Sequence, residues 1–137
     1  MVISEHNIYV GFMILNRQYF KYELPTPKFK VSRRYRTIGE FSYKSVDGMM
    51  TKPCITMSGE YDYTSRQFDD ILMHEMIHYY LAYTGEDLKC KHGKPFKRMA
   101  EMFNKNHGFN ITSIIDVSGY KIKEGNSQFF FRLCTFF

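Results

Sequence analysis

Apolar residues recur at spacings of three and four near the start of the chain. Within residues 6–20 these positions are Ile8, Phe12, Leu15 and Tyr19. Such spacing places the four side chains on one face, so the segment is predicted to be an amphipathic helix packed against the core. Pro25 and Pro27 follow, and because proline cannot continue a helix they predict an extended connection.

The pattern then changes to the alternation that is typical of β-strands. Residues 28–36 place Phe29, Val31 and Tyr35 on one side and Lys28, Lys30, Arg34 and Arg36 on the other. A second run, residues 36–44, follows almost at once, so we expect the two runs to pair as neighbouring strands. Residues 45–53 are predicted to form a turn or loop, and residues 54–58 a short third strand closed by Gly59.

Two further helices are predicted from their end signals. Thr64 and Gln67 have the spacing of a capping box, which begins a helix, and Gly85 is a good signal for its end. A second helix is expected from Gly93 to about Asn106, with Pro95 in its first turn and Gly108 after its end.

These elements predict an α+β fold: an N-terminal helix, a small mixed or antiparallel sheet, a long helix and a following helix. Beyond them, the chain is expected to form short strands or irregular structure. At 137 residues the chain is long enough to bury a core, and it contains no internal repeat or linker. We therefore interpret residues 1–137 as a single domain.

Composition excludes some classes of protein. A hydrophobic content of 44% is that of a globular protein rather than a disordered one. The formal charge of +5 permits binding to a polyanion such as nucleic acid, although many ordinary proteins share it. The apolar run at residues 8–15 is too short to cross a bilayer, so no membrane partner is expected. The cysteines Cys54, Cys90 and Cys134 form no CxxC pair, which fits a reducing cytoplasm.

The chemistry is concentrated in the long helix, where residues 74–78 read HEMIH, an HExxH motif. Histidines four apart project from one helical face, so His74 and His78 can bind one ion. Apolar residues surround the motif, and burying its polar groups there without partners would cost several kcal/mol, roughly, which a metal relieves. Glu75 lies beside the ion, where its carboxylate can take a proton from a zinc-bound water, whose pKa the metal lowers to about 7.

A catalytic zinc site of this kind needs a third protein ligand and an open fourth position. The downstream candidates are Glu86, Asp87, Cys90, His92 and His107. His92 is preferred because it begins a helix after a loop long enough to fold back. A Cys90 thiolate would make the bound water less acidic, and His107 lies at a helix end, where a capping or surface role is expected.

The HExxH motif, followed after thirteen residues by HGxxF, resembles the SprT-like metallopeptidase family, over about residues 10–115. The resemblance implies a zincin-like fold, with residues 116–137 as a C-terminal extension. It implies a zinc-dependent protease in which His74, His78 and His92 hold Zn²⁺ and Glu75 is the general base, acting on protein or peptide substrates. Some family members cleave proteins crosslinked to DNA. Many carry a C-terminal zinc ribbon, which we expect to be absent or truncated here because only Cys134 lies in that region.

Other readings of the same residues remain open. The basic stripe of Lys28, Lys30, Arg34 and Arg36 would suit a nucleic-acid-binding module, or only a solvated face. A scaffold with a retained but non-catalytic zinc site is a further alternative. The strand at residues 54–58 is either an edge that pairs with an extended substrate or an ordinary core strand. The remaining polar candidates near the motif, interpreted more simply as helix-end or structural residues, are Asp69, Asp70, Tyr61, Tyr63, Tyr79 and Tyr80.

Overall fold

The computed structural model describes residues 1–124, 135 and 136. The helices are α1 (Glu5–Phe20), α2 (Ser65–Thr84) and α3 (Lys94–His107). The strands are β1 (Lys28–Ser32), β2 (Gly39–Val46), β3 (Met49–Ser58), β4 (Tyr61–Asp62), β5 (Ile114–Ile115), β6 (Lys121–Ile122) and β7 (Thr135–Phe136). The predicted α+β class is confirmed: three helices combine with a small mixed sheet.

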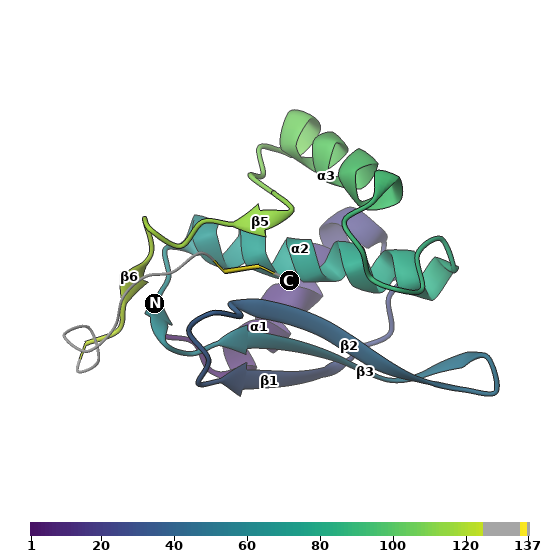
Figure 1. Ribbon diagram of the computed structural model, residues 1–137, viewed down its shortest axis with the longest axis horizontal. Helices are drawn as coiled ribbons and strands as arrows, with labels where there is room; N and C mark the ends of the chain where they lie inside the picture. The colour runs from purple at the N-terminus through teal and green to yellow at the C-terminus, as the bar shows by residue number, and fades with distance from the viewer. Residues whose placement is uncertain (125–134, 137) are drawn as a thin grey trace.

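Helix α2 is the central element of the fold. In Figure 1 it lies between the sheet below and α3 above, with α1 behind. It contacts β2, β3, α1 and α3. Because it is enclosed in this way, every residue from 71 to 79 is buried, including the three polar members of the HExxH motif. The fold therefore places the motif at the junction of the sheet and two helices.

Helix α1 matches the sequence prediction closely. Its buried face contains Ile8, Phe12 and Leu15, and Ser4 caps its first turn. It ends at Phe20, before the prolines, because Lys21 adopts a left-handed conformation with φ 52°. The buried Asn16 side chain then donates to the carbonyl of Leu24 at 2.8 Å, which fixes the path of the chain toward β1.

The order of the main sheet corrects the predicted strand pairing. The strands run in the order β1-β3-β2, so β1 and β2 are both edges of the sheet and do not pair with each other. β1 is parallel to β3, with Lys28 opposite Cys54 and Ser32 opposite Ser58. Proximity in sequence favoured a direct β1–β2 pair, but the buried half of β3 inserts between them. Of the two interpretations of residues 54–58, the structure supports the ordinary core strand and not the edge.

The predicted turn or loop at residues 45–53 is a β-hairpin, in which most of these residues belong to β2 and β3. β2 pairs antiparallel with β3 from Gly39 opposite Met57 to Val46 opposite Met49. The turn consists of Asp47 and Gly48, which both have positive φ values (52° and 77°). This Asp-Gly pair is a strong signal for a two-residue hairpin, and its significance was missed. In Figure 1 the hairpin extends well beyond the rest of the sheet.

The predicted basic stripe does not lie on one strand. Lys28 and Lys30 are exposed on β1 as the alternation predicts, but β1 ends at Ser32. Arg34 lies in the following turn, where its guanidinium forms an ion pair with Glu40 at 3.3 Å. The stripe that motivated a nucleic-acid-binding module is therefore interrupted after β1.

The ends of α2 and α3 follow their predicted signals. Thr64 and Gln67 form the reciprocal capping box of α2, and Gly85 ends the helix with φ 82°. Gly93 is the N-cap of α3, with a proline in the first turn, and Gly108 ends it with φ 73°. The later strands are short, as expected: β6 pairs with β4, and β7 pairs with β5. Cys134, which bears on the predicted ribbon, lies outside the described residues.

One cluster of buried apolar side chains joins these elements, from Ile3 before α1 to Ile122 in β6. The cluster is consistent with the single-domain interpretation, which stays a prediction. Within residues 1–124, 135 and 136, no helix is both long enough and apolar enough to cross a membrane.

Candidate metal centre

The two histidines of the HExxH motif lie on the inner face of α2. His74 is 1% exposed and His78 is 3% exposed, and their ring centroids are 5.0 Å apart. Imidazoles four residues apart on a helix point the same way. The third histidine, His92, comes from the segment that leads into α3, where it is half-buried.

The Nε2 atoms of the three histidines converge on one point. The Nε2 atom of His92 lies 3.1 Å from that of His74 and 3.1 Å from that of His78. Nitrogen ligands at roughly 2.0–2.1 Å around a tetrahedral zinc ion lie about 3.3–3.4 Å apart, close to this spacing. A single ring nitrogen has only one proton or one lone pair, so hydrogen bonding does not account well for both contacts. The arrangement fits a metal ion, which accepts all three lone pairs.

Nothing else among the described residues forms such a group. His74, His78 and His92 are the only cluster of three or more metal-ligating side chains in that part of the chain, with all ligand atoms within 4.8 Å of one another. Cys90 is outside the cluster, and its pKa is raised to about 11, mainly by burial and then by the charges of Asp87 and Glu75. It is therefore a neutral thiol at neutral pH.

The loop before His92 is held by specific contacts. The Tyr43 hydroxyl on β2 donates to the carbonyl of Leu88 at 2.6 Å. The Asp87 carboxylate accepts from the backbone N–H of Lys89 at 3.2 Å and of Lys91 at 2.9 Å. These bonds fix the loop between α2 and α3, so the third histidine is delivered to the other two by a structured segment.

The Phe96 ring packs against all three imidazoles. Its ring centroid lies 4.7 Å from that of His74, 4.6 Å from that of His78 and 4.9 Å from that of His92. The side chain is fully buried. Because Phe96 is four residues after His92, the first turn of α3 brings it beneath the histidines, which explains the spacing of the HGxxF sequence. An apolar support of this kind keeps water from the inner side of the site.

His78 is electrically suited to bind a cation. Burial, followed by the charge of His92, lowers its pKa to about 4. The imidazole is therefore neutral at neutral pH, which is the form that ligates a metal. The Nδ1 atom of His78 is buried and has no hydrogen-bond partner.

Glu75 faces β2, and its carboxylate is almost completely buried. One oxygen accepts the backbone N–H of Phe41, while Oε2 has no hydrogen-bond partner. Burial, and secondarily the charge of Glu40, raises the pKa of Glu75 well above its ordinary value. A buried acid with one anchored and one unpaired oxygen is arranged to accept a proton.

Gly39, the first residue of β2, makes room for this carboxylate. A Cβ atom at this position would lie 2.9 Å from Oε2 of Glu75 and 3.0 Å from Cγ2 of Ile71. Contacts shorter than 3.0 Å to a real Cβ essentially do not occur. The absence of a side chain at Gly39 is therefore a condition for the observed position of Glu75.

The other candidates from the sequence have structural roles. Glu86 and Asp87 are not part of the histidine cluster. His107 is exposed at the end of α3 and its ring packs on Tyr19 with a centroid distance of 4.9 Å, as expected for a surface group.

The buried tyrosines brace backbone carbonyls, with Tyr61 donating to Tyr35, Tyr63 to Ser58 and Tyr79 to Pro25. Asp70 accepts the N–H of Asn110. Tyr80 packs on Phe20, with the ring centroids 5.4 Å apart.

Three residues that shape the site were not identified from the sequence. Gly39 and Tyr43 reach it only through the position of β2, and no local pattern reveals that contact. Phe96 did have a signal, since its distance from His92 equals one helical turn, but its contact with all three rings appears only in the structure.

Comparison with protein-family models gives a match over most of the chain. The model of the SprT-like family matches residues 9–114, which contain most of α1, the main sheet, α2, α3 and the residues His74, Glu75, His78 and His92. No curated protein matches the chain.

Proposed function

The chain belongs to the SprT-like family, and from this premise we propose that it is a zinc-dependent endopeptidase. In this proposal His74, His78 and His92 hold Zn²⁺ and Glu75 is the general base. The convergence of three Nε2 atoms beside a buried carboxylate is the observation that carries the proposal. Histidine nitrogens suit zinc, and three of them leave a coordination position for substrate chemistry.

When bound, the zinc would polarise the scissile carbonyl and make a water molecule acidic enough to attack it. The protein supplies the proton transfers. Glu75 accepts the proton of the attacking water on Oε2, because the Phe41 N–H anchors the other oxygen. The protonated Glu75 then donates this proton to the amine nitrogen of the leaving peptide.

The donor set supports a catalytic rather than a structural site. Structural zinc sites are usually closed by four protein ligands, whereas catalytic sites use three. Cys90 is the nearest alternative fourth ligand in the sequence, and it lies outside the cluster formed by the described residues. A structural site also has no need of a buried, half-satisfied carboxylate such as Glu75, which is costly to keep.

The sheet suggests how an extended peptide binds. β3 is enclosed by β1 and β2 and has no free edge, whereas β2 is an edge strand in the described sheet. β2 also carries the two residues that adjoin Glu75: Gly39 through its missing side chain and Phe41 through its N–H. A substrate paired to the outer edge of β2 would use backbone hydrogen bonds, which are tolerant of sequence.

Glu75→Gln tests the role of the base. Glutamine has nearly the same shape but cannot accept the proton, so we expect peptide hydrolysis to fall at least about 100-fold while zinc content stays at one ion per chain. Hydrolysis of an unstructured protein substrate and metal analysis of the same sample measure both quantities. Full turnover in this variant would refute Glu75 as the base.

His92→Ala tests the third ligand. Losing a direct ligand should weaken zinc binding by more than the roughly 10- to 100-fold that loss of an outer hydrogen-bonding partner costs. Competition with a chelator measures the affinity, and His107→Ala is the matched control because His107 is outside the cluster. If zinc affinity does not change in His92→Ala, the third ligand lies elsewhere.

A nucleic-acid partner is a separate proposal, supported by the charge of +5 and by the exposed Lys28 and Lys30. DNA-associated proteins would then be the substrates. Binding to single-stranded DNA that weakens as salt increases would support it, and no binding at low salt would refute it. The cytoplasmic location expected from the cysteines also stays a prediction.

A further inference from the structure

A cavity of about 510 Å³ lies directly beside the metal centre. His74 forms part of its wall, so the cavity and the histidine cluster share a side chain. From His74 it follows α2 toward the helix N-terminus, past Ile71 and Asp70, to Gln67. Asp70 is four residues from His74, which is about 6 Å along the helix axis. This distance is about the length of a long side chain, so a side chain that enters the cavity beside the histidines can reach Asp70.

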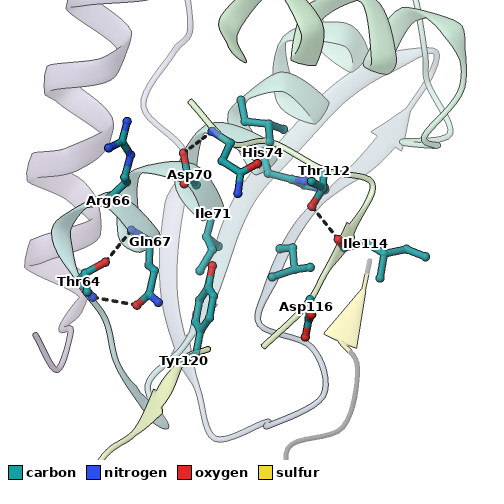
Figure 2. Close-up of a pocket in the computed structure, with 13 residues that line it drawn as sticks. Thr64, Arg66, Gln67, Asp70, Ile71, His74, Thr112, Ile114, Asp116 and Tyr120 are labelled. Atoms are coloured by element: carbon teal, nitrogen blue, oxygen red, sulfur yellow. Dashed lines mark hydrogen bonds between the residues drawn. The ribbon is translucent and has the colours of Figure 1, made fainter. Parts of the chain in front are cut away.

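Part of the cavity wall is apolar, although polar side chains also line it. Ile71 and Tyr120 lie on one side, and Ile114 and Asp116 on the other (Figure 2). The buried residues Ile111 and Ile115 complete its apolar part. Apolar walls of this kind pack the methylene groups of an unbranched side chain.

The charged groups of the cavity are mostly acidic, although the chain as a whole carries +5. Its lining contains the carboxylates of Asp70 and Asp116 and one guanidinium, that of Arg66. Arg66 is exposed and donates to the carbonyl of Gly108, which does not line this cavity. In Figure 2 its side chain extends away from Tyr120. The net charge facing the cavity is therefore negative.

Asp70 is the acid best placed to meet a bound group. It is half-buried, and one of its carboxylate oxygens accepts the N–H of Asn110 at 3.0 Å. Burial, and secondarily the charge of Asp70, raises the pKa of Tyr120, which also lines the cavity, to about 12. Asp116 is exposed and accepts the N–H of Ser118 at 3.0 Å, so it adds negative charge from the opposite side.

We propose that this cavity binds the side chain of a substrate residue next to the scissile bond, and that it selects lysine or arginine there. The methylene groups would pack between Ile71 and Ile115, and the cationic end would pair with Asp70. This inference rests on the proposed peptidase function, because it takes His74 as a zinc ligand. It makes Asp70 a specificity-determining residue.

The charge pattern argues against other occupants. An acidic side chain would face Asp70 and Asp116, and like charges in a site are repelled. A purely apolar side chain would fit the isoleucines of the lining but would gain no ion pair with the Asp70 carboxylate, which otherwise interacts with the charge of Arg66. A long basic side chain matches both the isoleucines and the acidic groups of the lining.

Three peptides test the preference, identical except for lysine, norleucine or glutamate at the residue on one or the other side of the scissile bond. Norleucine has the same unbranched stem as lysine without the charge. We expect kcat/KM to be about fivefold higher for lysine than for norleucine, the upper range for an ion pair that solvent can reach, and lowest for glutamate. Equal values for lysine and norleucine at both positions would overturn the proposal.

Asp70→Asn identifies the residue responsible. Asparagine keeps an oxygen for the Asn110 N–H but removes the charge, so the ratio of kcat/KM for the lysine peptide to that for the norleucine peptide should fall to about one. Asp69→Asn is the matched control, because Asp69 is the neighbouring acid and does not line this cavity. An unchanged ratio in Asp70→Asn, or an equal loss in Asp69→Asn, would refute the assignment.

Binding measurements separate this inference from the peptidase function. The zinc-loaded Glu75→Gln protein, and the same protein with Asp70→Asn added, are titrated with the lysine and norleucine peptides. Tighter binding of the lysine peptide that Asp70→Asn abolishes supports the cavity assignment even if the wild-type chain cleaves no peptide, in which case the proposed function alone fails. Equal binding of both peptides refutes the cavity assignment whether or not cleavage occurs.

Discussion

Replacing Gly39 with alanine is expected to displace the Glu75 carboxylate. The added Cβ would lie 2.9 Å from Oε2, whereas ordinary van der Waals contact begins at 3.4 Å, so one of the two groups must move by about 0.5 Å. Neither has much freedom. The carboxylate is anchored on the Phe41 N–H and buried, and β2 is hydrogen-bonded to β3 along its length.

This displacement should be visible in catalysis more than in folding. A misplacement of 1 Å in an active site costs on the order of 100-fold, so half that shift predicts about a tenfold lower kcat. Forcing one methyl group into a packed region destabilises a protein by about 1–3 kcal/mol. Zinc content should not change, because the histidines do not contact Gly39. Steady-state peptide hydrolysis, metal analysis and chemical unfolding measure the three quantities.

Gly119→Ala is the matched control, since the same added methyl group there has no atom within 4 Å. It should leave kcat, zinc content and stability as in the wild type. A wild-type kcat in Gly39→Ala would refute the reasoning. It would mean that catalysis does not depend on the position of the Glu75 carboxylate that the added methyl group must change.

Other predictions concern the loop and the ionisable groups. Tyr43→Phe removes the hydroxyl that holds the Leu88 carbonyl; at about 1 kcal/mol for such a bond, zinc should dissociate about fivefold faster into a chelator, and an unchanged rate would show that the loop is held by other contacts. In zinc-free protein, Glu75→Gln should raise the free energy of unfolding relative to the wild type. The difference should grow as pH rises above 4.5, because the folded wild type keeps the Glu75 proton that its unfolded state has already released. His78 has the opposite sign: its pKa is lowered from 6.5 to about 4, so its contribution to stability is present above pH 6.5, is lost as pH falls toward 4, and should be missing in His78→Gln. Urea unfolding of the zinc-free proteins at several pH values measures both slopes, and parallel curves for a variant and the wild type would contradict the corresponding assignment.

Sequence reasoning succeeded where the determining contacts are local. The ends of α2 depend on Thr64 bonding to Gln67 three residues away and on Gly85 adopting a positive φ, and both effects act within one helical turn. The HExxH pair also acts within one turn. The choice of His92 as a candidate needed only a loop long enough to return to α2, and the structure places its Nε2 atom with those of the other two histidines.

Sequence reasoning failed where distant segments meet. The alternation in β1 predicts a strand but contains nothing that names its partner, and the parallel pairing with β3 joins Lys28 to Cys54 across the whole of β2. The contacts of Gly39 and Tyr43 with the site have the same origin, because they follow from where β2 lies over α2. The hairpin is a different case: Asp47 and Gly48 carry a local signal for a two-residue turn, whereas the prediction extended the turn or loop over residues 45–53.

Because Phe96 lies on α3, retention of the metal ion depends on this one helix staying in place. Elements of a protein open with different free energies, and a helix on the outside of the fold can lift away while the sheet remains intact. His92 lies just before α3 and Phe96 lies in its first turn, so the two residues move with this helix. Detachment of α3 from α2 would therefore remove the third histidine and the Phe96 contact with the rings of His74 and His78 together. Metal escape would then track a partial opening, so the temperature at which the protein loses its ion would lie below the temperature at which it melts.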